Sequence, residues 1–108
     1  MITLTIRKNH KNQITEFEVN GHANFGVEGE DIVCAAVSSI TQTAALGLMN
    51  IAGIKLVMTR EEGYSKYTLP DSLSDEQEKA AEIILSTMYL GLDDLHQQFS
   101  DFIEITIE

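Results

Sequence analysis

His22 and Cys34 lie twelve positions apart in the stretch GHANFGVEGEDIVCAA, and Cys34 is the only cysteine of the chain. A cysteine sulfur beside an imidazole can attack a carbonyl carbon, while the imidazole accepts a proton and then donates it to the leaving group. The two side chains meet only if the chain folds back, and Gly26 and Gly29 between them would permit such a turn. We therefore treat the pair as a candidate catalytic site.

The environment expected for Cys34 activates the thiol only weakly. If the helix that follows begins after Asp31, this residue is the N-cap, and Cys34 lies in the first turn, where backbone N–H groups lack partners. The field of a helix end favours an anion by only about 0.3 to 1 kcal/mol. Glu28, Glu30 and Asp31 add negative charge nearby and oppose it. A strongly activated thiol therefore needs another neighbour, and His22 is the candidate.

Residue chemistry alone leaves several roles open for Cys34. Cysteine is among the most often buried residue types, so a structural thiol in the core is the commonest outcome. A catalytic thiol is the next, followed by a redox-sensing or metal-binding one. Metal binding is the weakest option, because one cysteine with His10, His22 and His96 shows no familiar ligand spacing. The residues themselves therefore indicate no metal site.

Three neighbours of the pair have two interpretations each. Ser38 follows Cys34 by one helical turn, so it either lines the site or packs between helices. Gly21 and the two glycines that follow it, Gly26 and Gly29, provide either a mobile loop for substrate entry or a plain turn. Asp31 either caps the helix or orients His22.

Alternating apolar and polar residues predict five strands, each with one buried face. Polar turns join the first two strands and the next two, which is the pattern of hairpins, and the other sheet face is expected to stay wet. The predicted strands cover residues 2–7, 14–19, 55–60, 64–69 and 102–108.

Two helices are expected between these strands. The later one begins at a capping box formed by Ser74 and Gln77 and is amphipathic. The earlier one, Ile32 to Ile54, holds 23 residues without a charge, enough to span a bilayer. Its six polar side chains argue against a membrane, so we expect a central helix that is covered on both sides. Its buried stripe is predicted to contain Val33, Val37, Ile40, Ala44 and Ile51.

The fold class is therefore α+β, with a mixed or antiparallel sheet of about five strands in the order ββαββαβ. We expect a single domain over residues 1–108. A second subunit is one way to cover the uncharged helix, so a homodimer is expected.

The charge distribution limits the possible partners, and the cysteine content indicates the cellular compartment. Residues 71–108 carry ten acidic side chains and one basic one, within a net charge of −10. This disfavours direct nucleic-acid binding and favours a basic protein partner. A lone cysteine and an alternating N-terminal segment indicate a reduced, cytoplasmic protein.

The motif GHA, a glycine-containing loop and GEDIVCAAVS together resemble the ribosomal-processing cysteine protease family, Prp. Chain length, element order and the uncharged helix are similar to that family as well. The resemblance implies that Cys34 is the nucleophile and His22 the general base and acid. It further implies a dimeric bacterial cytoplasmic endopeptidase without cofactor. Its implied substrate is the precursor of large-subunit ribosomal protein L twenty-seven, from which a short hydrophobic N-terminal extension is removed.

Two alternatives compete with this interpretation. One is a non-enzymatic, acidic, ribosome-associated binding module in which Cys34 is buried and structural. The other is a redox sensor, although the chain contains no second cysteine to resolve a sulfenic acid.

Overall fold

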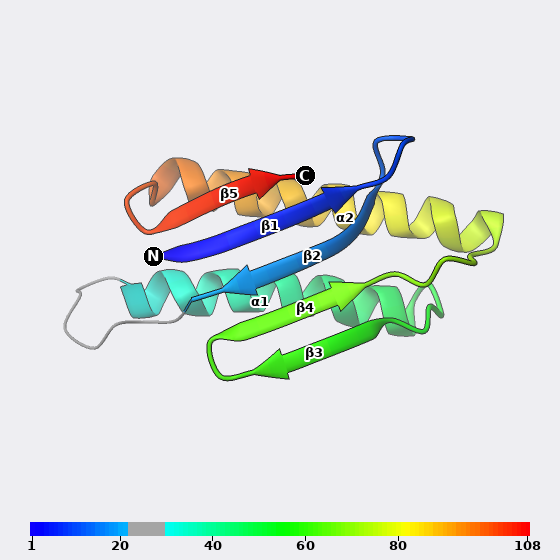
Figure 1. Cartoon of the computed structure of the whole chain (residues 1–108), viewed down its shortest axis with the longest axis horizontal. Helices are drawn as coiled ribbons and strands as arrows, with labels where there is room; N and C mark the ends of the chain where they lie inside the picture. Colours follow the sequence, from blue (N-terminus) through cyan, green and yellow to red (C-terminus); the bar gives the residue numbers. More distant parts are fainter. Residues whose placement is uncertain (22–29) are drawn as a thin grey trace.

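The elements follow one another in the predicted order. The computed structural model describes residues 1–21 and 30–108, and within them the order ββαββαβ is confirmed (Figure 1). The strands are β1 (Ile2–Lys8), β2 (Ile14–Asn20), β3 (Val57–Glu61), β4 (Tyr64–Thr68) and β5 (Ile103–Ile107), and the helices are α1 (Glu30–Asn50) and α2 (Asp75–Gln98).

The five strands form one mixed sheet in the order β3-β4-β2-β1-β5. β1 and β5 are parallel, and the other three pairs are antiparallel. Figure 1 shows both helices on the same face of the sheet, α1 behind β2 and β4 and α2 behind β1 and β5. The α+β class is therefore confirmed.

The core lies between the sheet and the helices. Strand alternation places Ile2, Leu4 and Ile6 on this face, where they are almost fully buried. Phe17 of β2 and Tyr67 of β4 are opposite each other in the register, and their rings stack with centroids 4.7 Å apart. Burial of these large side chains provides the main driving force for closing the sheet over the helices.

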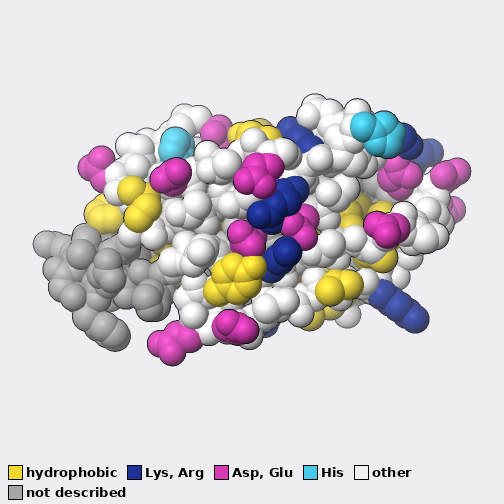
Figure 2. Space-filling model, in the orientation of Figure 1, with side chains coloured by type: hydrophobic (Ala, Val, Ile, Leu, Met, Phe, Trp, Pro, Cys, Tyr) yellow, Lys and Arg dark blue, Asp and Glu magenta, His cyan; other side chains and the backbone are white. Residues whose placement is uncertain are grey.

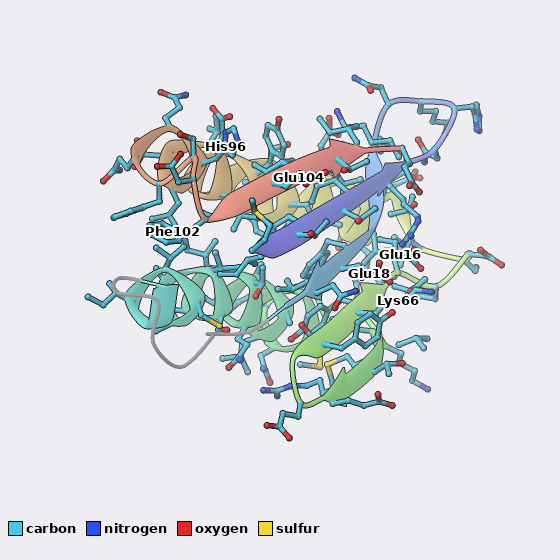
Figure 3. The ribbon with its side chains drawn as sticks, turned by 60° about the vertical axis from the view of Figure 1, so that its left-hand side comes forward. Glu16, Glu18, Lys66, His96, Phe102 and Glu104 are labelled. Atoms are coloured by element: carbon cyan, nitrogen blue, oxygen red, sulfur yellow. The ribbon has the colours of Figure 1, made fainter. Side chains whose placement is uncertain are left out.

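The other face of the sheet is wet, as expected, and carries a network of charges. Figure 2 looks onto this face, where acidic and basic side chains alternate over the middle strands. Arg7 pairs with Glu16 and lies 3.7 Å from Glu18, while Lys66 lies 3.6 Å from Glu16. Figure 3 shows Glu16, Glu18 and Lys66 side by side. Burial opposes ionisation of Glu16, but hydrogen bonds from Thr68 and Arg7 outweigh it, so the pKa of Glu16 is lowered.

Helix α2 begins at the predicted capping box. The Ser74 side chain accepts a hydrogen bond from the Gln77 backbone N–H, and the Gln77 side chain accepts one from the Ser74 backbone. Small residues let the two helices approach: a Cβ added to Gly91 would lie 3.5 Å from the Ile40 side chain. Helix α1 is thus packed against α2 along one flank and against the sheet along another.

The predicted bounds of α1 were wrong at both ends. The helix begins at Glu30 and ends at Asn50, four residues before Ile54. Gly53 has a φ of +65°, and the Ile54 N–H bonds back to the Leu48 carbonyl, so the chain reverses there. Ile51, placed in the buried stripe, lies beyond this end and is 83% exposed.

All five strands differ from their predicted ranges at one or both ends, and the largest shift is at the start of β3. Strand β3 begins at Val57, β4 ends at Thr68, and β5 begins at Ile103. These are shifts of one or two residues at element ends, where pairing is weakest.

The outer side of α1 is not covered by the residues that the structure describes. Ile32 is 71% exposed and Leu46 is 57% exposed. By length and composition Ile32–Asn50 could cross a membrane, a test that the core helix of a soluble protein also passes. Within one chain the sheet covers one side of α1 and α2 covers another, as expected, while the outer side remains exposed (Figure 1).

Candidate active site

Cys34 lies on α1, one full turn inside the helix. Because α1 begins at Glu30, Asp31 belongs to the first turn, so the prediction that Asp31 is the N-cap was wrong. Cys34 is the fifth helical residue and lies beyond the unpaired first-turn N–H groups. Its side chain is half-buried and packs against the core while remaining partly accessible. This placement differs from that of a fully buried structural thiol.

A pocket of about 140 Å³ opens beside Cys34. The first half of α1 forms one wall, and the ends of β2, β3 and β4 form the other. It is lined by Ile2, Val19, Gly21, Cys34, Val37, Ser38, Gln42, Arg60, Glu61, Gly63, Tyr64 and Ser65. A peptide that entered this pocket would meet the sulfur between a helix and a hairpin.

Of the predicted neighbours, Ser38 and Gly21 are brought to Cys34 in this pocket. Sequence reasoning missed Gln42, Arg60 and Tyr64. Gln42 follows Cys34 and Ser38 at the next interval of four, so extending that helical row would have found it. Arg60 and Tyr64 reach the pocket through the register of the second hairpin, which no local motif reveals.

Gly21 holds the end of β2 against two other strands. Its N–H donates to the Gly63 carbonyl at 2.8 Å, and its φ is +114°. A Cβ at this position would lie 2.4 Å from the Met1 carbonyl oxygen. Glycine is required here both for the backbone conformation and for the close approach. The residue directly before His22 is therefore fixed in place.

Replacing Gly21 by alanine is expected to lower the free energy of unfolding by at least about 2 kcal/mol, because it adds strain and a clash with backbone. The matched control is Gly53→Ala, since Gly53 also has a positive φ but no atom within 4 Å of an added Cβ. That change should cost only about 1 kcal/mol. Thermal unfolding followed by circular dichroism compares the two, and equal losses would contradict the role of the close approach.

Tyr64 forms part of the pocket wall but directs its hydroxyl away from the sulfur. The hydroxyl donates to a Glu18 carboxylate oxygen at 2.5 Å. This hydrogen bond, with some burial and the Glu18 charge, raises the pKa of Tyr64. The phenol therefore stays neutral near pH 7 and reaches Glu18 on the wet face of the sheet, so it supplies no proton acceptor to the sulfur.

The other half of the predicted pair lies outside the described residues. This applies to His22, to Gly26 and Gly29, and to the side chain of Asp31. Neither of the remaining histidines lines the Cys34 pocket. His10 lies in the turn after β1, and His96 lies near the end of α2 (Figure 3). His22 thus remains the predicted partner of Cys34.

A second and larger hollow, about 580 Å³, lies at the opposite end of the sheet beside His10 and the first half of α2. No cysteine lines it, so the larger of the two pockets is not the one that contains the thiol. We assign the chemistry to the smaller pocket because it holds the only thiol. Within residues 1–21 and 30–108, no three His, Cys, Asp or Glu residues are grouped in a way that could hold a metal ion.

An accessible thiol on a helix, facing a pocket walled by a hairpin, is the arrangement of a thiol-dependent enzyme. Comparison with known families identifies which one. The family of the cysteine protease Prp matches residues 1–104, so the chain belongs to this family and is a cysteine peptidase.

Individual relatives agree with that assignment. The ribosomal processing cysteine protease Prp of Bacillus subtilis (strain 168) is 32% identical over 108 residues, covering 98% of this chain and 96% of the relative. A crystal structure of Prp from S. aureus in complex with a substrate peptide has the same fold, with a TM-score of 0.88, 23% identity and full coverage of both chains. Prp from S. aureus with a covalently linked product peptide gives a TM-score of 0.84 at 25% identity, again with full coverage of both chains.

Proposed function

We propose that this chain is an endopeptidase that removes the short hydrophobic N-terminal extension of large-subunit ribosomal protein L twenty-seven in the bacterial cytoplasm. The observation that carries the proposal is that a member of a cysteine protease family has one cysteine, and this cysteine is accessible in a pocket. The name of the B. subtilis relative, a ribosomal processing protease, supports a ribosomal substrate.

The proposed reaction passes through a thioester. The Cys34 sulfur attacks the carbonyl carbon of the scissile bond while His22 takes up the thiol proton. His22 then donates that proton to the leaving amine, the C–N bond breaks, and the leader remains bound to sulfur as an acyl-enzyme. Water, deprotonated by His22, releases the leader as a carboxylic acid and restores the thiol. The covalently linked product peptide of the S. aureus relative supports such a route.

Gly21 has a positioning role in this proposal. It fixes the backbone directly before His22 through the hydrogen bond to Gly63 and the contact with Met1. Because Gly63 also lines the Cys34 pocket, the same hydrogen bond connects the pocket wall with the residue before the histidine.

Mass spectrometry of the extended precursor tests the function. Incubation with the protein should give one cut near the end of the hydrophobic leader, and the mature ribosomal protein, which lacks the leader, should remain intact. The mature form is the matched control because it has the same basic body. If the precursor stays uncut while its body binds the protein, the acidic binding module becomes the better account.

We further propose that the protein is a homodimer formed through the outer side of α1. From residue 32 to residue 50, where the structure describes the side chains of α1, every exposed side chain is uncharged, whereas the net charge of the chain is −10. An exposed, charge-free helical row of this kind is typical of a surface that is buried in an assembly. The row consists of Ile32, Ala35, Ser39, Gln42, Thr43, Leu46 and Asn50.

Leu46→Glu is expected to shift the dimer toward monomer by at least about tenfold in dissociation constant, because a charge would be buried in an apolar contact. The control is Ile107→Glu, which adds the same charge at an exposed apolar position of β5 on the far edge of the sheet. Sedimentation velocity over a range of concentrations measures both. A wild-type protein that stays monomeric throughout, or equal effects of the two changes, would contradict the interface.

A further inference from the structure

Strand β3 forms one end of the sheet and has an open outer edge. All five of its residues are exposed, and among the described residues only β4 pairs with it. Sheet edges are usually protected by charges, prolines or bulges. In β3 the first three residues, Val57 to Thr59, are uncharged and contain no proline. This edge is therefore able to accept another strand.

Hydrogen bonds at the two ends of β4 show which way its backbone groups point. Toward β2, Leu69 donates its N–H to Thr15 and Gly63 accepts one from Gly21. Since residues along a strand bond alternately to the two neighbours, the odd-numbered residues of β4 face β2 and the even-numbered ones face β3. The register then determines which residues of β3 are used in this pairing.

Val57, Thr59 and Glu61 stand opposite the even-numbered residues of β4, so their backbone groups are bonded to β4. The N–H and C=O groups of Met58 and Arg60 therefore point to the open edge. The two residues are separated by one, about 6 to 7 Å along the strand, which is the spacing at which an added strand makes its hydrogen bonds.

This edge leads into the Cys34 pocket. Arg60 and Glu61, at the end of β3, line that pocket together with Ser38 and Gln42 from α1. A strand paired with Met58 and Arg60 would thus continue towards the sulfur. The apolar side chains at the other end of β3, Val57 and Met58, are 61% and 42% exposed and would border the same strand.

We propose that the open edge of β3 binds the backbone of the substrate as an added strand and in this way delivers the scissile bond to Cys34. The occupant is an uncharged, extended segment of the polypeptide being cleaved, held by backbone hydrogen bonds to Met58 and Arg60. This inference rests on the proposed peptidase function. It assigns affinity to the backbone of the substrate, and it makes Val57 and Met58 the side chains that favour an apolar leader.

The first test is a scan of substrate N–H groups. A synthetic peptide spanning the leader and the first mature residues of the L twenty-seven precursor is prepared with single N-methyl groups at successive positions at least two residues from the cleaved bond. The kcat/KM should fall about tenfold at every second position and change less than about threefold between them, because only alternate N–H groups bond to a neighbouring strand. Equal effects at all positions would overturn the proposal.

A change in β3 shows whether this edge is the partner. Met58→Pro removes only the outward N–H and leaves the bonds of Val57 and Thr59 to β4, and proline is tolerated at such edge positions. Met58→Ala is the matched control because it removes the side chain but keeps the N–H. Both variants lose the side chain, but only Met58→Pro loses the N–H that would donate to a substrate carbonyl. Its kcat/KM for the unmodified peptide should therefore be about tenfold below that of Met58→Ala.

A folded Met58→Pro protein that cleaved the peptide as fast as Met58→Ala would place the substrate on another edge and overturn the assignment to β3. If that variant does not fold, the scan on the unaltered enzyme still decides whether the peptide binds as a strand, and Val57→Glu then tests the edge. This charge should lower kcat/KM about tenfold for the apolar leader. No effect would overturn the assignment. Cleavage of the unmodified peptide, measured first, separates failure of this proposal from failure of the proposed function.

Discussion

Replacement of Cys34 by alanine is expected to abolish cleavage of the precursor, with kcat/KM lower by about 10⁴ to 10⁶. The sulfur forms the covalent bond to the substrate in the proposed reaction, and the chain has no other cysteine that could replace it. Alanine is a good helix former, so α1 should remain intact. Cleavage is followed by mass spectrometry, and thermal unfolding shows that the variant is folded.

Cys34→Ser gives the stricter comparison because it changes only sulfur to oxygen. A serine without its own activating system is a poor nucleophile, so this variant should also be inactive while binding the uncut precursor. Cleavage at the wild-type rate by either variant would mean that Cys34 has a structural role only.

His22→Ala is expected to lower kcat/KM by at least about 10² to 10⁴, which is the usual contribution of acid–base catalysis. Loss of the proton acceptor should also slow alkylation of Cys34 by iodoacetamide, because the thiolate is the reactive form. Both rates are measured on the same preparation.

His10→Ala and His96→Ala are the controls for this change. Both remove an imidazole, and neither residue lines the Cys34 pocket. They should leave cleavage and alkylation within about twofold of wild type. If His22→Ala behaved like these controls, the thiol would not depend on an imidazole and the proposed mechanism would be wrong.

Alternation of apolar residues was sufficient to predict the sheet, because one face of each strand is buried against the helices while the other is wet. Ile2, Leu4 and Ile6 are almost fully buried, as this pattern requires. The end of α1 was missed because the apolar run continues through Ile51, whereas Gly53 ends the helix through a backbone reversal. The pattern of apolar residues alone contains no signal for such a helix end.

The candidate site was predictable only in part. Cys34 and Ser38 share a helix face, and spacing alone places them together. Arg60 and Tyr64 arrive from a hairpin more than twenty residues later, and their positions depend on which residues of β3 and β4 are opposite each other. That register follows from the whole sheet, so no short motif contains it.

The parallel pairing of β1 with β5 constrains how the protein is made. Ile2 lies opposite Ile103, so two neighbouring strands are separated by about 100 residues of sequence. During synthesis from the N-terminus, β1 lacks this neighbour until β5 has left the ribosome. Closing so long a loop is also a slow step in folding. The nascent chain therefore completes its sheet, and with it the core around Ile103, only after both helices and the other four strands have been synthesised.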